Sequence, residues 1–181
     1  AFYGASKPAP TIGTVANINK NLTDPAFVLP LPSSNSSGAF TYSSSNTAII
    51  SINGSMATIS GIGTATITAT QAASDSYGSG STTFTISVKT IPTLFLPNMA
   101  ALVGGSAITL NATSNSNGAI TYSSGSTGVA SILNSTLTIA GVGASVITVT
   151  QAASGNYTAA TYLAIITVGN TTLINPTQKH T

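Results

Sequence analysis

Charged side chains are nearly absent from this chain of 181 residues, because Asp, Glu, Lys and Arg together make up only 3% of it. Ordinary soluble proteins carry about a quarter. The charged residues are four scattered lysines and two aspartates, namely Lys7, Lys20, Lys89, Lys179, Asp24 and Asp75. Binding of nucleic acid needs clustered Lys and Arg that neutralise phosphates. We therefore expect no nucleic-acid partner.

Residue types that catalyse reactions or hold metals are just as scarce. The chain has no cysteine, so it can form no disulfide and offers no thiolate ligand. Its single histidine, His180, lies next to the last residue. Asp24 and Asp75 lie at opposite ends of one repeat, which disfavours both a general acid–base pair and a Ca²⁺ site with several carboxylates. The sequence predicts a protein that is not an enzyme and that has neither cofactor nor metal.

Long apolar runs are missing as well. A membrane span needs about 18 consecutive apolar residues, and no stretch approaches that length, so we expect no membrane span in this chain. The chain starts at Ala1 without the charged and apolar segments of a signal peptide, so we expect a mature chain or a fragment. A surface made of hydroxyls and amides repels little and associates readily, which favours a place inside an assembly or under a coat of glycan.

An internal repeat dominates what is present. Residues 35–88 align without a gap with residues 115–168, and about half of the aligned positions are identical. The repeat is clearest at residues 61–77 and 141–157, where both copies read Gly-x-Gly, alternating β-branched residues, Gln-Ala-Ala-Ser and a tyrosine. One supersecondary plan is therefore used twice.

The repeat also predicts the domain organisation. We expect an arm at 1–7, a first domain at 8–89, a second domain at 90–168, and at 169–181 a tail or the first strand of a further repeat. The linker between the domains is very short, so we expect them to follow one another with little freedom. Function is then to be sought at the arms, the linker and the sheet edges.

Apolar and polar residues alternate in short stretches, and no segment keeps a helical period over a useful length. The expected strands of the first domain are residues 10–15, 26–30, 39–43, 48–52, 56–59, 64–70 and 82–88. Asn53-Gly54 favours a two-residue hairpin turn between two of them. About seven short strands with frequent turn signals are typical of an antiparallel β-sandwich.

Two features of the repeat suit either a ligand or the fold. The Gly-x-Gly pairs lack the helix and lysine of a phosphate loop, so we interpret them as turns that need a positive φ: Gly61, Gly63, Gly141 and Gly143. Repeated tyrosines suit stacking on sugars, but more often they close the end of a sandwich and hydrogen-bond to loop backbone. These tyrosines are Tyr42, Tyr77, Tyr122 and Tyr157.

Other candidate sites lie on loops and at the two ends. Asn-x-Ser/Thr sequons, which accept glycans on exposed loops in a suitable host, occur at Asn21, Asn35, Asn53, Asn111, Asn134, Asn156 and Asn170. Many sequons arise by chance in a chain rich in Asn, Ser and Thr, whereas glycosylation would favour a eukaryotic virus or an archaeal host. The residues suited to contacts between subunits are Phe2, Tyr3, Leu173 and Ile174. The tail either frays or adds a strand to a neighbouring sheet.

Several stretches together resemble a known family. They are residues 24–29 (DPAFVL), 38–47 (GAFTYSSSNT), 61–73 (GIGTATITATQAA) and Tyr77. This set is similar to the bacterial immunoglobulin-like (Big-type) repeats of surface proteins, although the second copy has residues 105–108 (GSAI) in place of the Asp-x-x-Phe element. The resemblance implies two tandem immunoglobulin-like antiparallel β-sandwiches, as used on extracellular adhesins, fibres and viral surfaces. It carries no catalytic residue.

These observations favour a non-enzymatic structural module of an extracellular or virion surface assembly, such as a fibre, filament or decoration. Edge strands and terminal arms would join it to copies of itself or to other surface or virion proteins. The alternative is an adhesin or tail-fibre module that binds a surface glycan or a host receptor. Either role places the protein outside the cell, on a cell surface or on a virion.

Overall fold

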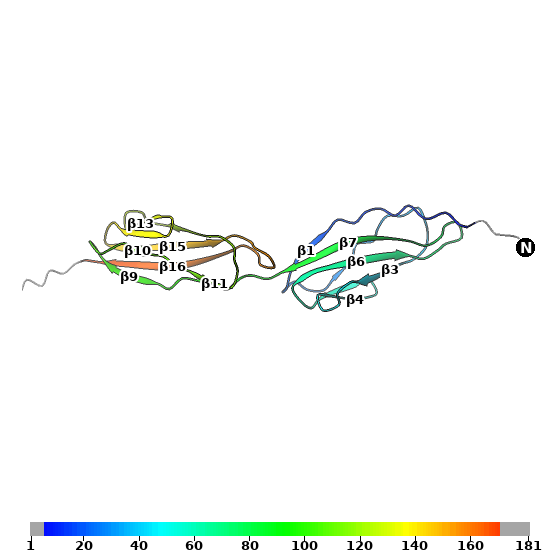
Figure 1. The fold of residues 1–181 in the computed structure, drawn as a ribbon, viewed down its shortest axis with the longest axis horizontal. Coiled ribbons are helices and arrows are strands. Elements are labelled where there is room, and N and C mark those ends of the chain that lie inside the picture. The colour runs from blue at the N-terminus through cyan, green and yellow to red at the C-terminus, as the bar shows by residue number, and fades with distance from the viewer. Residues whose placement is uncertain (1–5, 171–181) are drawn as a thin grey trace, which may run out of the picture. The chain divides into compact units, whose positions relative to one another are not determined.

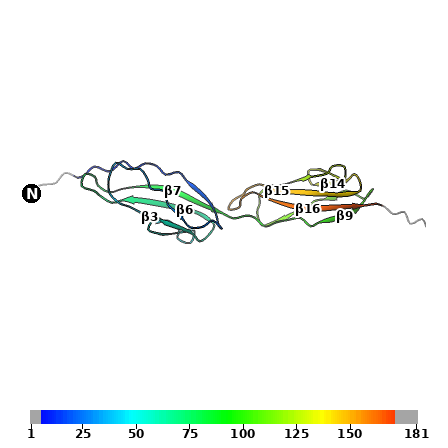
Figure 2. The same cartoon turned by 180° about the vertical axis from the view of Figure 1, so that it is seen from behind.

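The computed structural model describes residues 6–170. The chain divides into two compact units, Ala1–Thr90 and Ile91–Thr181. Every regular element of the described part is a β-strand, and no helix occurs in it. Figures 1 and 2 show the two longest strands of each unit lying next to each other, β6 with β7 and β15 with β16.

The first unit consists of two sheets. The four-stranded sheet has the order β1 (Ile18–Asn21), β7 (Gly80–Lys89), β6 (Gly63–Gln71) and β3 (Phe40–Ser44). The three-stranded sheet has the order β2 (Phe27–Val28), β5 (Met56–Ile59) and β4 (Ile50–Asn53). Most neighbours are antiparallel, but β1 runs parallel to β7.

The second unit repeats this plan. Its four-stranded sheet has the order β12 (Ile120–Ser124), β15 (Gly143–Gln151), β16 (Ala160–Gly169) and β9 (Met99–Leu102). Its three-stranded sheet has the order β10 (Ile108–Thr109), β14 (Thr136–Ile139) and β13 (Ala130–Leu133). A further short pair joins β8 (Leu94–Phe95) and β11 (Thr113–Ser114). The edge strand β9 is again parallel to its neighbour, β16.

A hydrophobic core lies between the sheets of each unit. In the first unit, Ile67 of β6 and Ile86 of β7 are fully buried together with Ile50 of β4 from the other sheet. Along the same strands, buried residues alternate with half-buried or exposed ones, as the period of two along a strand requires. The predicted fold class, two β-sandwiches in tandem, is therefore confirmed.

The predicted opening strand at residues 10–15 is wrong in detail. Only a single bridge forms there, between Ile12 and Ser34. The chain then joins the edge of the four-stranded sheet as β1, a strand that the sequence pattern did not predict. Asn17 supports this pairing, because its Oδ1 accepts a hydrogen bond from the Thr85 backbone N–H at 2.9 Å. The sequence of β1, INKN, is polar and does not show the apolar alternation that predicts a strand.

The predicted hairpin turn is shifted by one residue. Asn53 still belongs to β4 and pairs with Met56, so the two turn residues are Gly54 and Ser55. Gly54 has a φ of 62°. The second unit places Asn134, with a φ of 56°, at the corresponding position. Glycine and asparagine adopt this left-handed conformation at the lowest energetic cost. The positive φ therefore explains why glycine stands at position 54 and asparagine at position 134.

Candidate functional site

Two charged residues of the described part have local structural contacts. The Asp24 carboxylate accepts a hydrogen bond from the Asn21 backbone N–H at 3.0 Å and closes the turn after β1. The Lys20 ammonium lies 4.4 Å from the centre of the Phe27 ring. Residues 6–170 contain no group of three or more His, Cys, Asp or Glu side chains that could hold a metal ion. The single histidine, His180, lies outside the described residues.

A buried glutamine organises one end of the first unit. Gln71, the last residue of β6, is only 1% exposed. Its Oε1 accepts a hydrogen bond from the Ser34 hydroxyl at 2.6 Å. Its Nε2 donates to the backbone carbonyls of Ser36 at 2.9 Å and Gly38 at 2.8 Å. One side chain thus anchors the loop that leads into β3.

The second unit reproduces this anchor. Gln151 is fully buried. Its Oε1 accepts a hydrogen bond from the Ser114 hydroxyl at 2.6 Å, and its Nε2 donates to the carbonyls of Ser116 at 2.9 Å and Gly118 at 3.0 Å. No buried side-chain N or O atom of the described part lacks a partner. The repeated Gln-Ala-Ala-Ser motif is therefore used to fasten a loop.

The glutamines stand out in the sequence as part of the repeated motif, but the loop residues that they contact do not. Gly38 is required because a Cβ there would lie 1.9 Å from the carbonyl oxygen of Ala72. Gly118 faces Ala152 in the same way, again at 1.9 Å. The signal was present in both copies as Asn-Ser-x-Gly ahead of the strand, but only the fold shows that this stretch meets the glutamine.

Of the four glycines interpreted as turn residues with a positive φ, Gly63 and Gly143 are confirmed, at 129° and 137°. The interpretation is wrong for Gly61 and Gly141, which have no positive φ; a Cβ at either position would instead lie 2.6 Å from a backbone carbonyl oxygen. Tyr42 and Tyr122 also behave as expected for residues that fasten loop backbone. The Tyr42 hydroxyl donates to the Pro30 carbonyl at 3.1 Å. The Tyr122 hydroxyl accepts a hydrogen bond from the Ala112 N–H at 2.9 Å. Burial raises the pKa of the Tyr42 hydroxyl above its ordinary value of 10.0.

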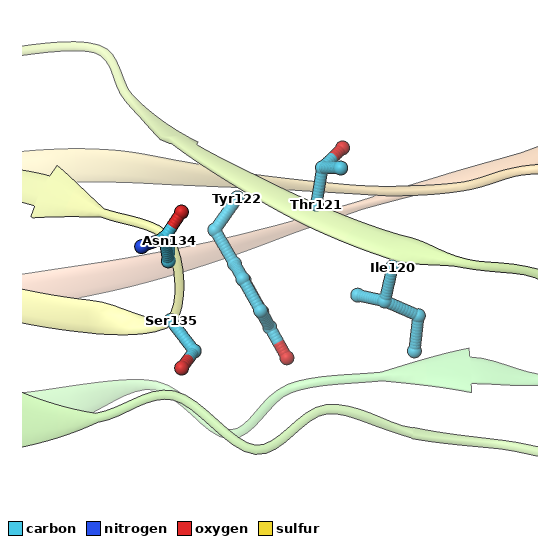
Figure 3. A pocket seen from close by; sticks show the side chains of 5 residues that line it. All are labelled: Ile120, Thr121, Tyr122, Asn134 and Ser135. Carbon is cyan, nitrogen blue, oxygen red and sulfur yellow. The ribbon is translucent and has the colours of Figure 1, made fainter.

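Two depressions have linings that suit a neutral polar ligand. The first, of about 440 Å³, lies on the second unit and is lined by Ile120, Thr121, Tyr122, Asn134 and Ser135. Figure 3 shows Ile120 and Tyr122 on the same side of β12, with Asn134 and Ser135 reaching the depression from the turn between β13 and β14. The second, of about 280 Å³, is lined by Asn35, Ser37, Ser74, Asp75, Ser76 and Tyr77. Their hydroxyl and amide groups could hydrogen-bond to sugar hydroxyls.

The structure places all the sequon asparagines at exposed positions: Asn21, Asn35, Asn53, Asn111, Asn134, Asn156 and Asn170. Asn35 has a second role, because its Oδ1 accepts a hydrogen bond from the Thr11 N–H at 2.8 Å. The residues proposed for contacts between subunits, Phe2, Tyr3, Leu173 and Ile174, lie outside the described residues. In residues 6–170, no helix is long and apolar enough to cross a membrane.

Edge strands are the remaining candidate contact surface. In the described part of each unit, the four-stranded sheet ends on one side in a parallel edge strand, β1 or β9, and on the other side in β3 or β12. The outer side of an edge strand presents N–H and C=O groups that can pair with another chain. Among the contact surfaces considered above, the edges are the ones that lie within the described residues.

No protein-family model matches the chain. No curated protein sequence matches it. Among solved structures, extracellular domains 3–5 of Drosophila OTK match with a TM-score of 0.54 and 13% identity, covering 90% of this chain and 63% of that one.

Two further structures match less closely. The insect immune protein hemolin matches with a TM-score of 0.43 and 13% identity over 93% of this chain, which spans 49% of the hemolin chain. Human protocadherin-24 EC1-2 matches with a TM-score of 0.41 and 14% identity over 90% of this chain and 99% of that chain. At such identities the likeness concerns the fold alone. The chain is thus built from two β-sandwich units with an immunoglobulin-like fold.

Proposed function

We propose that this chain is a non-enzymatic structural module of an extracellular or virion surface assembly. The observation that carries the proposal is the internal use of the repeated motif. The most distinctive repeated polar residues are Gln71 and Gln151. Their side chains donate hydrogen bonds to loop carbonyls of their own unit. These repeated glutamines therefore serve the fold of each unit, as expected for a structural building block.

The proposal includes the finer organisation of the chain. An arm at residues 1–7 and a tail at 169–181 flank domains at 8–89 and 90–168, and the domains are of the Big type. The arms and edge strands join each module to copies of itself or to other surface or virion proteins. The near absence of charge supports this role, because surfaces without charge repulsion associate readily.

Glycans on the exposed sequons would fit the same role. Each sequon asparagine of the described part is accessible to solvent, which attachment of a glycan requires. Hydrated sugars would keep a surface with 3% charged residues soluble without adding charge. Intact-mass measurement on protein from the native source, before and after enzymatic deglycosylation, tests this point. An unchanged mass would reject it.

The test of the assembly role compares the full chain with two truncated chains in light scattering over a concentration series. The full chain should form larger species as concentration rises. Removing residues 171–181 should abolish this growth if the tail donates a strand, and removing residues 1–7 should weaken it if Phe2 and Tyr3 dock on a neighbour. A full chain that stays monomeric at every concentration contradicts the proposal.

A second candidate function is an adhesin or tail-fibre module that binds a neutral glycan or a host receptor. The depression beside Tyr122 favours it, because an aromatic residue lies there next to the side chains of Asn134 and Ser135. Binding of the full chain to a glycan array tests the idea. Asn134→Gly removes the amide while tolerating the φ of 56°, so it should lower binding without unfolding the turn. Equal binding by this variant argues against the depression.

A further inference from the structure

The second unit exposes apolar side chains on the outer face of its four-stranded sheet. Val146 of β15 lies directly opposite Ile165 of β16, and Leu163 lies one outward position further along β16. These side chains are 42%, 44% and 62% exposed, respectively. Their sequence neighbours Ile147 and Ile166 are fully buried on the inner face. Both faces of this sheet are therefore apolar at its centre.

The exposed apolar region continues along the sheet. Ala144 lies opposite Thr167, which in turn lies opposite Ala100 of β9. Leu102, at the end of β9, is 54% exposed. We call this region the apolar face, and it consists of Ala100, Leu102, Ala144, Val146, Leu163 and Ile165, with Thr148 and Thr167 lying between them. The strands β9, β12, β15 and β16 carry no charged residue.

The first unit provides an internal comparison, because the same sheet there has a polar outer face. Its residues at the corresponding places are Asn19, Asn21, Thr64, Thr66, Thr83 and Thr85. The register supports the correspondence, since Ile18 pairs with Ile86 just as Met99 pairs with Ile166. The sheet therefore folds with hydroxyls and amides at these positions. The apolar residues of the second unit exceed what the fold needs, which is typical of a contact surface.

We propose that the apolar face docks on the apolar face of a second copy of this chain. In a contact with two-fold symmetry each patch meets itself, so an apolar patch without charged residues, such as this face, suits a second copy of itself. Outer faces of two sheets can pack with interdigitated side chains about 10 Å apart, as in a sandwich. A lipid surface fits less well, because helices and strands that bind it carry Lys, Arg and aromatic residues around the apolar side chains.

The size of the face predicts a weak, reversible contact. The three strands that carry the face contain 4, 9 and 10 residues. A strand spacing of about 4.8 Å and a rise of about 3.3 Å per residue give roughly 360 Å² for each copy. The pair then buries roughly 720 Å², below the ~1,200 Å² of stable specific complexes. This inference rests on the proposed assembly role and names one surface for it, which uses neither the edge strands nor the terminal arms.

The test gives the second unit the residues of the first. The triple variant Val146→Thr, Leu163→Thr, Ile165→Thr of the full chain is compared with the unaltered chain by sedimentation velocity over a concentration series. Threonine favours strands, and the first unit tolerates it at these positions. We expect reversible dimers of the unaltered chain and a dissociation constant raised at least about tenfold in the variant. Thermal unfolding followed by circular dichroism checks that the variant is folded.

Two matched variants sharpen the result. Leu133→Thr removes a leucine that is 76% exposed on β13, in the other sheet, and should leave dimerisation unchanged. The reverse triple, Thr66→Val, Thr83→Leu, Thr85→Ile, gives the first unit an apolar face and should produce species larger than dimers. Both outcomes support the apolar face, whereas equal loss of dimers from Leu133→Thr would overturn it.

Truncation separates this inference from the proposed function. If removing residues 171–181 abolishes association and the threonine triple does not, the result supports strand donation by the tail and contradicts docking through the apolar face. If the triple abolishes association and the truncation does not, the reverse holds. An unaltered chain that remains monomeric at every concentration overturns both proposals. That outcome includes the case in which the apolar face binds a different protein.

Discussion

Gln71 shows how one neutral side chain can anchor a loop by hydrogen bonds without a buried ion pair. Its amide satisfies a hydroxyl and two carbonyl groups at once, at distances of 2.6–2.9 Å. A buried carboxylate or ammonium would need a partner of opposite charge, and the chain has few charges to offer. Glutamine is long enough to reach across the loop and stays neutral. It therefore suits a core without ion pairs.

The first prediction concerns this anchor. Gln71→Ala leaves the carbonyls of Ser36 and Gly38 without their donor, and it should lower the free energy of unfolding of the first unit by about 2–3 kcal/mol. Native-state hydrogen exchange measures this change strand by strand. Amides of β15 in the second unit serve as an internal reference and should keep their protection. Ser37→Ala, at an exposed neighbouring position, should change little, and equal effects of the two variants would contradict the anchor role.

The second prediction separates two structural reasons for glycine: lack of space for a Cβ at Gly38, and a positive φ at Gly54. Gly38→Ala places a Cβ against the carbonyl of Ala72 and should destabilise the first unit by at least about 2 kcal/mol. Gly54→Asn keeps the positive φ and meets no atom within 4 Å, so it should change stability by less than about 0.5 kcal/mol. Urea unfolding followed by circular dichroism compares the variants. Similar losses in both would show that crowding is not the cause at Gly38.

Among the elements, each parallel edge strand is preceded by an asparagine whose side chain bonds to the neighbouring strand. Asn17 and Asn98 accept a hydrogen bond from the backbone N–H of Thr85 and Ile165 at 2.9 Å and 2.8 Å. Each amide continues the ladder just before the first paired residue of β1 or β9. The asparagine therefore marks where the chain joins the four-stranded sheet.

The third prediction follows from this placement. Asn17→Ala should cost about 0.5–1.5 kcal/mol and loosen β1 more than the rest of the sheet. Hydrogen exchange of the Thr85 amide, measured by NMR, should become faster. Asn19→Ala is the matched control, because Asn19 is an exposed residue of the same strand. Unchanged exchange at Thr85 in the Asn17 variant would show that the side chain does not hold the edge.

The two cores reach similar packing with different side chains. Phe84 of the first core is replaced by Ala164 in the second. Leu137 of the second core replaces Ala57 of the first, so the volume lost on one strand is regained on another. Cores tolerate such exchanges when total volume and pattern are kept. The repeat therefore preserves a plan of elements even where individual core residues differ.

For the whole molecule, the low charge sets the response to solution conditions. Folding gains little from surface ion pairs, so salt should change its stability only slightly. One titration should nevertheless be visible at high pH. Burial raises the pKa of the Tyr42 hydroxyl above 10.0, so the folded state holds this proton more tightly than the unfolded state. This contribution to stability is present below about pH 10 and is lost as the pH rises through the folded pKa.

The fourth prediction is therefore a small loss of stability of the first unit above about pH 10, with little change between about pH 5 and 8. Urea unfolding at a series of pH values and at two salt concentrations measures it. Tyr42→Phe removes the titrating group and the hydrogen bond to Pro30, so the variant should be less stable at neutral pH and lose less above pH 10. A gain of stability above pH 10 in the unaltered chain would contradict the assignment.

The chain by itself determined the repeated β-sandwich. Alternation with a period of two, the glycines with positive φ and the gapless repeat are local signals that agree with one another, so they predict strands and turns before any contact is known. The same signals predicted β5 at its observed bounds, Met56–Ile59, and placed the glutamine motif at the end of a strand.

Only the tertiary structure decided which distant residues meet. The parallel pairing of β1, the loop that fastens to Gln71 and the outward alignment of Val146 with Ile165 all depend on strand register across many residues. In the sequence, residues 144–149 read ASVITV, with apolar and hydroxyl side chains on both alternating sets, so the pattern does not say which side chains face outward. Register between strands assigns each residue to one face of the sheet, and the apolar face exists only once that register is set.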